Sequence, residues 1–245
     1  MIGIVGGLGS YAGLDLVKKI FDQTKANTDQ EHLSVALLSI PQQIEDRTAF
    51  LLNETNINPA NAIFTIIRKL EQIGADIIGI ACNTAHTPEI FDVILKKLKQ
   101  ANSTVRLVHM IKEVAAYIRE SYPPVRNVGV LCTTGTYKTS LYPNILEPEG
   151  FNVITPDQAL QNNMVNKAIY EIKAGFSPVS KAVKEQVLAG IKHLQKKGAE
   201  AIVLGCTELP LAVGAGQIGE TVIIDPTLIL ARALIRVVAP YKLKP

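Results

Sequence analysis

Two of the three cysteines occupy matching places in this sequence, and a thiol can both release and take up a proton near neutral pH. Cys82 follows an apolar run in GADIIGIAC, and Cys206 follows one in GAEAIVLGC. In each stretch the cysteine lies eight residues after the glycine. Short apolar runs after a glycine predict buried strands, and open α/β sheets place their chemistry where such strands end. The spacing therefore indicates two thiols at the carboxyl ends of two related strands.

The residues after each cysteine suit a turn that opens into a helix. Asn83-Thr84 follows Cys82, and Thr207-Glu208 follows Cys206. Main-chain N–H groups at such a turn lower the pKa of a thiol and bind a carboxylate. No histidine attends either cysteine at a spacing that suits hydrolysis. Two facing thiols suit two-base proton transfer instead, in which one removes a proton from carbon and the other delivers one.

A lone cysteine is often a small buried core residue rather than a reactive one. Cys132 ends the apolar run that contains Val130 and Leu131, so we expect it in the core. His86 lies four residues after Cys82, and His109 lies at an expected strand end. For both histidines, packing or capping is a more typical role than catalysis.

Strands and helices alternate along the chain, which predicts parallel sheets covered by helices on both faces. The opening segment GIVGGLGSY aligns without a gap with GVLCTTGTY at 129–137, and the elements that follow agree in order. We therefore expect an α/β protein of two pseudo-symmetric, flavodoxin-like domains with an active-site cleft between them. The first domain is expected at residues 1–104 plus 214–245, completed by the last strand and helix, and the second at residues 105–213.

The composition is typical of a globular protein, with 47% hydrophobic and 19% charged residues. A net charge of +3 gives no reason to expect nucleic acid or an anionic membrane as a partner. No apolar run approaches the roughly 20 residues that span a bilayer. The sequence starts on a predicted strand without an export signal, so we expect a cytoplasmic protein with free thiols. The cysteines and the four histidines are scattered, which argues against a zinc site.

The loop from Gly7 to Ala12 reads GLGSYA and fits a dinucleotide fingerprint, so a nicotinamide-dependent oxidoreductase is an alternative. Such a site also needs an acidic residue at the end of the second strand, and that strand ends Ser39-Ile40-Pro41. A tight turn, or the approach of a substrate to main-chain N–H groups, explains the glycines better. A non-catalytic amino-acid-binding protein is a third reading.

At these motifs the chain resembles the aspartate/glutamate racemase family, the cofactor-independent two-cysteine racemases, along nearly its whole length. The matching motifs are Gly6-Gly7-Leu8-Gly9, Cys82-Asn83-Thr84-Ala85-His86, Thr133-Thr134-Gly135-Thr136 and Gly205-Cys206-Thr207-Glu208. The stretch from Pro41 to Arg47 and the Lys173-Ala174-Gly175 segment resemble the aspartate racemase branch. The glutamate racemase branch carries an acidic residue where this chain has Gly7 and a histidine where it has Glu208.

The resemblance implies an enzyme that interconverts L- and D-aspartate, with glutamate as a second candidate substrate, using neither pyridoxal phosphate nor a metal. Cys82 and Cys206 would be the two acid/bases. Five polar residues would hold the α-carboxylate: Asn83, Thr84, Thr133, Thr136 and Thr207. Arg47 and Lys173 would hold the side-chain carboxylate. The resemblance also implies a homodimer whose ligand is a small amino acid, and it leaves decarboxylase or cis–trans isomerase chemistry of the same superfamily as alternatives.

Overall fold

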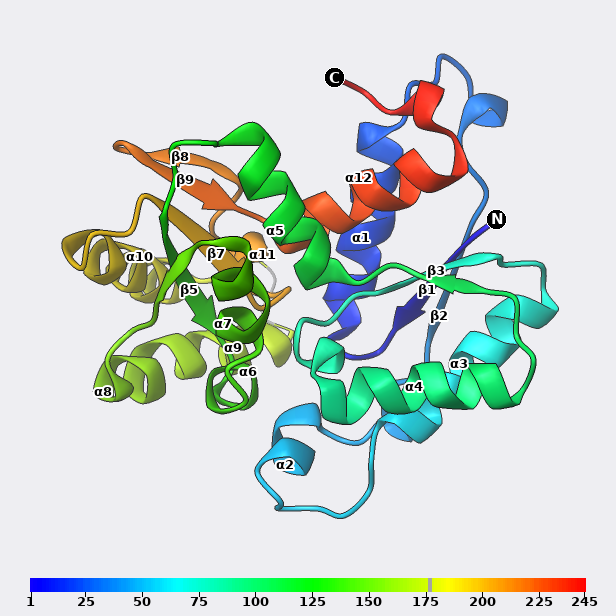
Figure 1. The fold of residues 1–245 in the computed structure, drawn as a ribbon, viewed down its shortest axis with the longest axis horizontal. Helices are drawn as coiled ribbons and strands as arrows, with labels where there is room; N and C mark the ends of the chain where they lie inside the picture. The colour runs from blue at the N-terminus through cyan, green and yellow to red at the C-terminus, as the bar shows by residue number, and fades with distance from the viewer. Residues whose placement is uncertain (176–177) are drawn as a thin grey trace. The chain divides into compact units, whose positions relative to one another are not determined.

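The computed structural model describes residues 1–175 and 178–245, and each of its two β-sheets is flanked by helices (Figure 1). The chain divides into two compact units, Met1–Glu113 with Thr227–Pro245, and Val114–Pro226. Parallel pairing dominates both sheets. The expected α/β fold is therefore confirmed. Among the described helices, none has the length and apolar character needed to cross a membrane.

The first unit is built on a parallel sheet with the strand order β2-β1-β3-β4. Its strands are β1 (Ile2–Gly6), β2 (Val35–Ser39), β3 (Ile77–Ile80) and β4 (Arg106–Leu107). Its helices are α1 (Ser10–Gln23), α2 (Arg47–Leu51), α3 (Ala60–Gln72), α4 (Pro88–Gln100) and α12 (Pro226–Val238), which starts at the unit boundary. Short 3-10 turns occur at Asp29–Glu31, Pro41–Gln43, Thr84–His86 and Pro240–Lys242.

Helices cover both faces of this first sheet. On one face, apolar side chains spaced three and four residues apart bury α3 against the strands, namely Ile63, Ile66, Ile67 and Leu70. On the other face, Gly79 of β3 leaves room for α1 and α12. A Cβ atom at position 79 would lie 2.8 Å from Leu234 and 3.5 Å from Leu16. In Figure 1 the blue α1 and the red α12 lie side by side on this face.

The second unit is built on a sheet with the order β6-β5-β7-β9-β8, in which only the β8–β9 pair is antiparallel among the described strands. Its strands are β5 (Asn127–Cys132), β6 (Asn152–Ile154), β7 (Ala201–Gly205), β8 (Gly216–Ile218) and β9 (Thr221–Ile224). Its helices are α6 (Thr134–Lys138), α7 (Leu141–Leu146), α8 (Gln158–Leu160), α9 (Lys167–Lys173), α10 (Lys181–Lys196) and α11 (Leu209–Ala212). A 3-10 turn lies at Glu147–Glu149 and a π-helix at Gln161–Asn166, while α5 (Met110–Ser121) crosses the unit boundary.

The internal repeat in the sequence is also a repeat in the packing. Gly3 of β1 and Gly129 of β5 each allow three side chains to approach closely. These neighbours are Leu70, Ala75 and Ile78 in the first unit and Leu194, Ala199 and Ile202 in the second. Each neighbour in the second set follows its counterpart by as many positions as Cys206 follows Cys82. Since β6-β5-β7-β9 also repeats the order β2-β1-β3-β4, the chain contains the same α/β arrangement twice.

Three of the described strands, β4, β8 and β9, differ from the expected domain ranges. The main-chain N–H of Arg106 donates to the carbonyl of Asp76, so β4 pairs with β3 in the first sheet rather than opening the second domain. Val222 pairs with Ala201, so β9 joins the second sheet rather than completing the first domain. Residues from Thr227 onwards do return to the first unit. The partners of β4 and β9 are distant in sequence, which explains why local patterns place these strands differently, and β8 follows β9 into the second sheet by pairing with it.

Candidate active site

Cys82 lies in the turn that follows β3. Its main-chain N–H donates to the carbonyl of Ile80 at 2.8 Å, which bends the chain out of the strand. Asn83 and Thr84 come next, both buried, and a 3-10 turn leads to Pro88, the first residue of α4. The Cys82 side chain is 6% exposed and belongs to the core that α3 and α4 form with the sheet. The thiol, the polar pair and the proline-started helix thus follow the strand in the expected order.

His86 holds the main chain of this first cysteine. Its Nδ1 lies 2.8 Å from the carbonyl oxygen of Cys82, which can only accept, so Nδ1 carries the proton. The ring stacks on Phe91, and its centroid lies 4.9 Å from that of His109. Burial lowers the pKa of His86 to about 4. Burial, together with the charges of His86 and Lys112, lowers the pKa of His109 to about 3. Both rings are therefore neutral at neutral pH, which suits the packing and capping roles expected of them.

Arg47 lies at the start of a helix and not in an open loop. It is the first residue of α2, and the Asp46 side chain caps that helix by accepting from the N–H of Ala49 at 2.8 Å. The Arg47 side chain is 7% exposed. Its Nη2 donates to the carbonyl of Leu8 at 2.6 Å and its Nη1 to the carbonyl of Glu45 at 3.3 Å. The guanidinium therefore joins the glycine loop after β1 to the segment after β2.

The glycine loop itself is closed by main chain rather than open to a nucleotide. Gly7 has a φ of +81°, which favours glycine, and a Cβ atom there would lie 2.8 Å from the nitrogen of Pro41. Close packing of Gly7 on Ile40 and Pro41 explains this glycine without a ligand. β2 ends at Ser39, so the acidic residue of a dinucleotide site is also missing from the strand end.

The threonine loop of the second unit follows β5. Thr133 is the N-cap of α6, and its Oγ1 accepts from the N–H of Thr136 at 3.4 Å and donates to the hydroxyl of Thr136 at 3.1 Å. Both threonines are buried. Gln161, in the π-helix, donates from Nε2 to the carbonyl of Cys132 at 2.7 Å. Burial raises the pKa of the Cys132 thiol to about 12, as suits the core residue expected there.

Cys206 directly follows β7, and hydrogen bonds to Glu208 join its thiol to the side chains of the next two residues. Its Sγ donates to Oε2 of Glu208 at 2.9 Å, and the Thr207 hydroxyl donates to the same oxygen at 3.3 Å. The three side chains are at most 5% exposed. Burial, and then the charge of Glu208, raises the pKa of Cys206 well above its ordinary value, while the charge of Lys173 acts in the opposite direction. In this structure Cys206 is therefore a protonated thiol with a carboxylate partner.

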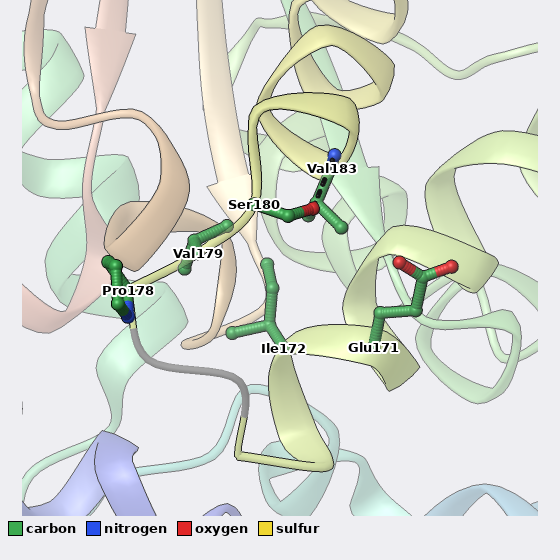
Figure 2. Close-up of a pocket in the computed structure, with 6 residues that line it drawn as sticks. All are labelled: Glu171, Ile172, Pro178, Val179, Ser180 and Val183. Atoms are coloured by element: carbon green, nitrogen blue, oxygen red, sulfur yellow. Dashed lines mark hydrogen bonds between the residues drawn. The ribbon is translucent and has the colours of Figure 1, made fainter.

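Lys173 is the last residue of α9, and its Nζ lies 5.2 Å from the centre of the Tyr170 ring. A cavity of about 270 Å³ opens beside the end of this helix (Figure 2). Its described lining residues are Glu171, Ile172, Pro178, Val179, Ser180 and Val183. None of these is an expected site residue, and the one dashed bond in Figure 2 is the Ser180 N-cap of α10. This cavity therefore gives no support to a ligand site at the two cysteines.

Comparison with known proteins decides the class of this chain. The family model described as Asp/Glu/Hydantoin racemase matches residues 5–234. The chain belongs to the Asp/Glu/hydantoin racemase family. It is 27% identical to the broad specificity amino-acid racemase RacX of Bacillus subtilis (strain 168), over 99% of this chain and 100% of that protein. Membership of this family argues against the two alternative hypotheses, a nicotinamide-dependent oxidoreductase and a non-catalytic amino-acid-binding protein. The protein is an amino-acid racemase.

Two solved structures resemble this racemase closely. Picrophilus torridus aspartate racemase shares 30% identity with a TM-score of 0.79, over 96% of this chain and 93% of that one. An aspartate racemase homologue from Pyrococcus horikoshii OT3 shares 27% identity with a TM-score of 0.70, over 96% of this chain and 97% of that one. These similarities give the whole chain, and not just one half, the architecture of a racemase.

The expected site residues of this racemase fall into two groups, one in each compact unit. The first unit contributes Arg47, Cys82, Asn83 and Thr84, and the second contributes Thr133, Thr136, Lys173, Cys206 and Thr207. Among the contacts that the sequence did not predict are the bond between Cys206 and Glu208 and the bond from Gln161 to Cys132. For the bond between Cys206 and Glu208, the sequence did hold a signal, because a carboxylate lies only two residues after the thiol. For the second, the 29 positions between the partners left no local signal.

Proposed function

We propose that this racemase interconverts L- and D-aspartate by proton transfer at Cα between Cys82 and Cys206, without a cofactor. The repeat carries the proposal, because it puts a buried thiol after β3 and another after the equivalent β7. One cysteine, as a thiolate, takes the Cα proton and forms an S–H bond, and the electron pair stays on the substrate carbanion. The other cysteine, as a thiol, gives its proton to the opposite face of Cα. For the other enantiomer the two roles are exchanged.

The carbanion is stabilised mainly through the α-carboxylate, so the groups that hold this carboxylate matter for the rate. We assign it to the neutral donors next to the cysteines and in the threonine loop, which are Asn83, Thr84, Thr133, Thr136 and Thr207. All five are buried, where a hydrogen bond to a carboxylate is strong because water does not compete.

Aspartate is proposed as the substrate because we assign two basic residues, Arg47 and Lys173, to its second carboxylate. Arg47 is buried in the first unit and donates to the carbonyls of Leu8 and Glu45. Lys173 exerts its charge near Cys206 in the second unit. A carboxylate that leaves water needs charge-assisted partners, and these two basic residues would supply them. The similarity to an aspartate racemase also favours this substrate, while the similarity to a broad specificity racemase makes the substrate range the point to test.

Cα-proton exchange in D₂O tests the proposal. Purified protein, dialysed and given no pyridoxal phosphate, is incubated separately with L-aspartate, L-glutamate and L-alanine, and deuterium at Cα and the D-enantiomer are measured by NMR and chiral chromatography. We expect both signals with aspartate, less with glutamate and little with alanine. Equal rates on all three would contradict aspartate specificity. Activity that appears only after pyridoxal phosphate is added would contradict the two-cysteine mechanism.

We also propose that the protein is a cytoplasmic homodimer. Apolar side chains on α1 are exposed in the single chain, with Leu14 56% and Tyr11 43% accessible, and a partner subunit would cover them. Light scattering after size exclusion should give twice the chain mass of 26.5 kDa, and fractionation of cells should place the protein with the cytoplasmic fraction. A monomer at micromolar concentration would refute the dimer.

A further inference from the structure

We propose that Glu208 is the proton partner of Cys206, so that thiol and carboxyl share one proton and Glu208 takes it when Cys206 acts as the base. This rests on the proposed function for its place in catalysis, although the shared proton itself can be tested without a substrate. Glu208 acts through Cys206 and is therefore a positioning residue. Its role would give Cys206 two usable forms in a site that is closed to water.

The geometry permits direct transfer. The Cys206 Sγ lies 2.9 Å from Oε2 of Glu208, within the range for a proton to pass between two heavy atoms. The short turn between β7 and α11 fixes this distance, because the N–H of Leu209 donates to the carbonyl of Cys206 and the N–H of Leu211 to that of Glu208, both at 3.0 Å. The Thr207 hydroxyl donates to the same Oε2 at 3.3 Å and helps to orient the carboxylate.

The burial of Glu208 needs an explanation that packing does not give. The side chain is 2% exposed, and glutamate is seldom buried unless it has a specific partner. Its two described donors, Cys206 and Thr207, both point at Oε2, while Oε1 is buried with no hydrogen bond to any described residue. A buried carboxylate with one oxygen unsatisfied is costly in free energy. Its presence here therefore indicates that its negative charge, or its ability to accept a proton, has a function.

Pairing with Glu208 lets Cys206 become a thiolate without a change in the total charge of the two buried side chains. Ionising Cys206 to solvent would put a thiolate beside a carboxylate inside the protein, and burial and Glu208 together raise the pKa of this thiol. Passing the proton from Sγ to Oε2 breaks the S–H bond, makes an O–H bond and leaves the charge of the pair unchanged. Lys173 on α9 favours the thiolate, and Tyr142 on α7 also interacts electrostatically with Cys206.

The full cycle balances. In one direction Glu208 holds the proton, the Cys206 thiolate removes the Cα proton, and the Cys82 thiol delivers its own proton to the opposite face. The enzyme then carries a Cys82 thiolate and a protonated Glu208. In the other direction Cys82 removes the Cα proton, Cys206 delivers its proton, and Glu208 returns a proton to Cys206. Cys82 lacks this arrangement, because the position that matches Glu208 is occupied by Thr84.

The first test titrates the thiol without substrate. In a Cys82→Ala/Cys132→Ala background, ultraviolet thiolate absorbance follows the ionisation of Cys206 as the pH is raised. Glu208→Gln keeps the size of the side chain and removes its charge, so the midpoint should fall by on the order of one pH unit. Glu220→Gln, at an exposed glutamate of the same unit, should not move the midpoint. An unchanged midpoint in Glu208→Gln would overturn the pairing.

The second test measures turnover in the otherwise native chain. Glu208→Gln should lower kcat by about 10²-fold with little change in KM, since a positioned base contributes on the order of 10²–10⁴. Glu208→Asp keeps a carboxylate and should recover part of the loss, which a purely structural role would not predict. Turnover at the native level in Glu208→Gln would overturn the proposal. A shifted midpoint in a protein that racemises no amino acid would support the shared proton and refute only the proposed function.

Discussion

The thiol of Cys206 donates to the carboxylate of Glu208 across 2.9 Å, whereas the residue at the matching position after Cys82 is Thr84. The two cysteines therefore differ in their chemical surroundings although the strands before them are equivalent. A carboxylate that accepts from Cys206 favours its protonated form. The two halves of the repeat thus place the same nucleophilic atom beside different polar neighbours.

Replacement of either proposed catalytic cysteine should remove racemisation. Cys82→Ser and Cys206→Ser should each lower kcat by about 10²-fold or more, because an alcohol cannot be poised to exchange protons near neutral pH. Cα-deuterium exchange of both enantiomers measures the effect. Cys132→Ser is the matched control, since this thiol is buried in β5 and should leave turnover largely intact. Equal losses in Cys132→Ser and Cys82→Ser would mean that the active site is assigned wrongly.

Arg47→Ala should change substrate preference and not only activity. Loss of a charge-assisted partner is expected to lower kcat/KM for aspartate by about 10-fold to 100-fold, while alanine, which has no side-chain carboxylate, should be affected less. The ratio of the two kcat/KM values is the measurement. If both substrates lose activity equally, Arg47 acts by holding the Leu8 carbonyl in place and takes no part in specificity.

Lys173→Met tests the second basic residue proposed to bind the side-chain carboxylate. It also separates two effects of the Lys173 charge, which are binding of the substrate and lowering of the pKa of Cys206. Loss of the ammonium should raise KM for aspartate and also raise the pKa of Cys206, because Lys173 acts to lower it. The pH–rate profile and KM for aspartate are measured together. A change in the profile with no change in KM would assign Lys173 to the thiol and exclude it from the substrate.

The elements around the site follow from local patterns, but several contacts in it do not. Apolar runs between glycines and polar pairs are enough to place Cys82 and Cys206 at strand ends. The burial of Arg47 is different, because its carbonyl partner at Leu8 is 39 positions away and belongs to another loop. The sheet that β9 joins likewise depends on a pairing with β7 that no local pattern encodes. Glu208 was adjacent and visible, yet only its side-chain conformation shows that it turns back onto Cys206.

The repeated glycine contact predicts matched losses of stability. A methyl group at Gly3 would lie 2.5 Å from Ile78, and one at Gly129 would lie 3.0 Å from Ala199, Ile202 and Leu194. Gly3→Ala and Gly129→Ala should each destabilise by about 1–3 kcal/mol through overpacking, with the larger loss at Gly3. Thermal and denaturant unfolding measure this. Gly214→Ala, where the space is open, is the control, and an equal loss there would contradict the packing argument.

His86 should make stability depend on pH. Its pKa is about 4 in the folded protein and 6.5 unfolded, so the unfolded chain binds more protons between these values. The stabilisation is complete above pH 6.5 and is lost as the pH falls towards 4. Lowering the pH from 7 to 5 should therefore reduce the free energy of unfolding by about 2 kcal/mol through this residue. In His86→Gln, the free energy of unfolding should depend less on pH over this range than in the control variant His193→Gln. Equal pH dependence in the two variants would refute the assignment of this effect to His86.

The discontinuous first unit has a consequence for the order in which the protein is completed during synthesis. Residues 1–113 make most of that unit, but α12 packs on Gly79 through Leu234, and the strand-like pairing of Thr24 with Leu243 closes it. Residues 114–226 form a continuous unit and leave the ribosome before residues 227–245 do. The unit that is translated second can therefore be finished first, while the earlier one keeps part of a sheet face, the part beside α1 that α12 covers, exposed until α12 emerges. A nascent chain stalled before Thr227 should expose that face to chaperones.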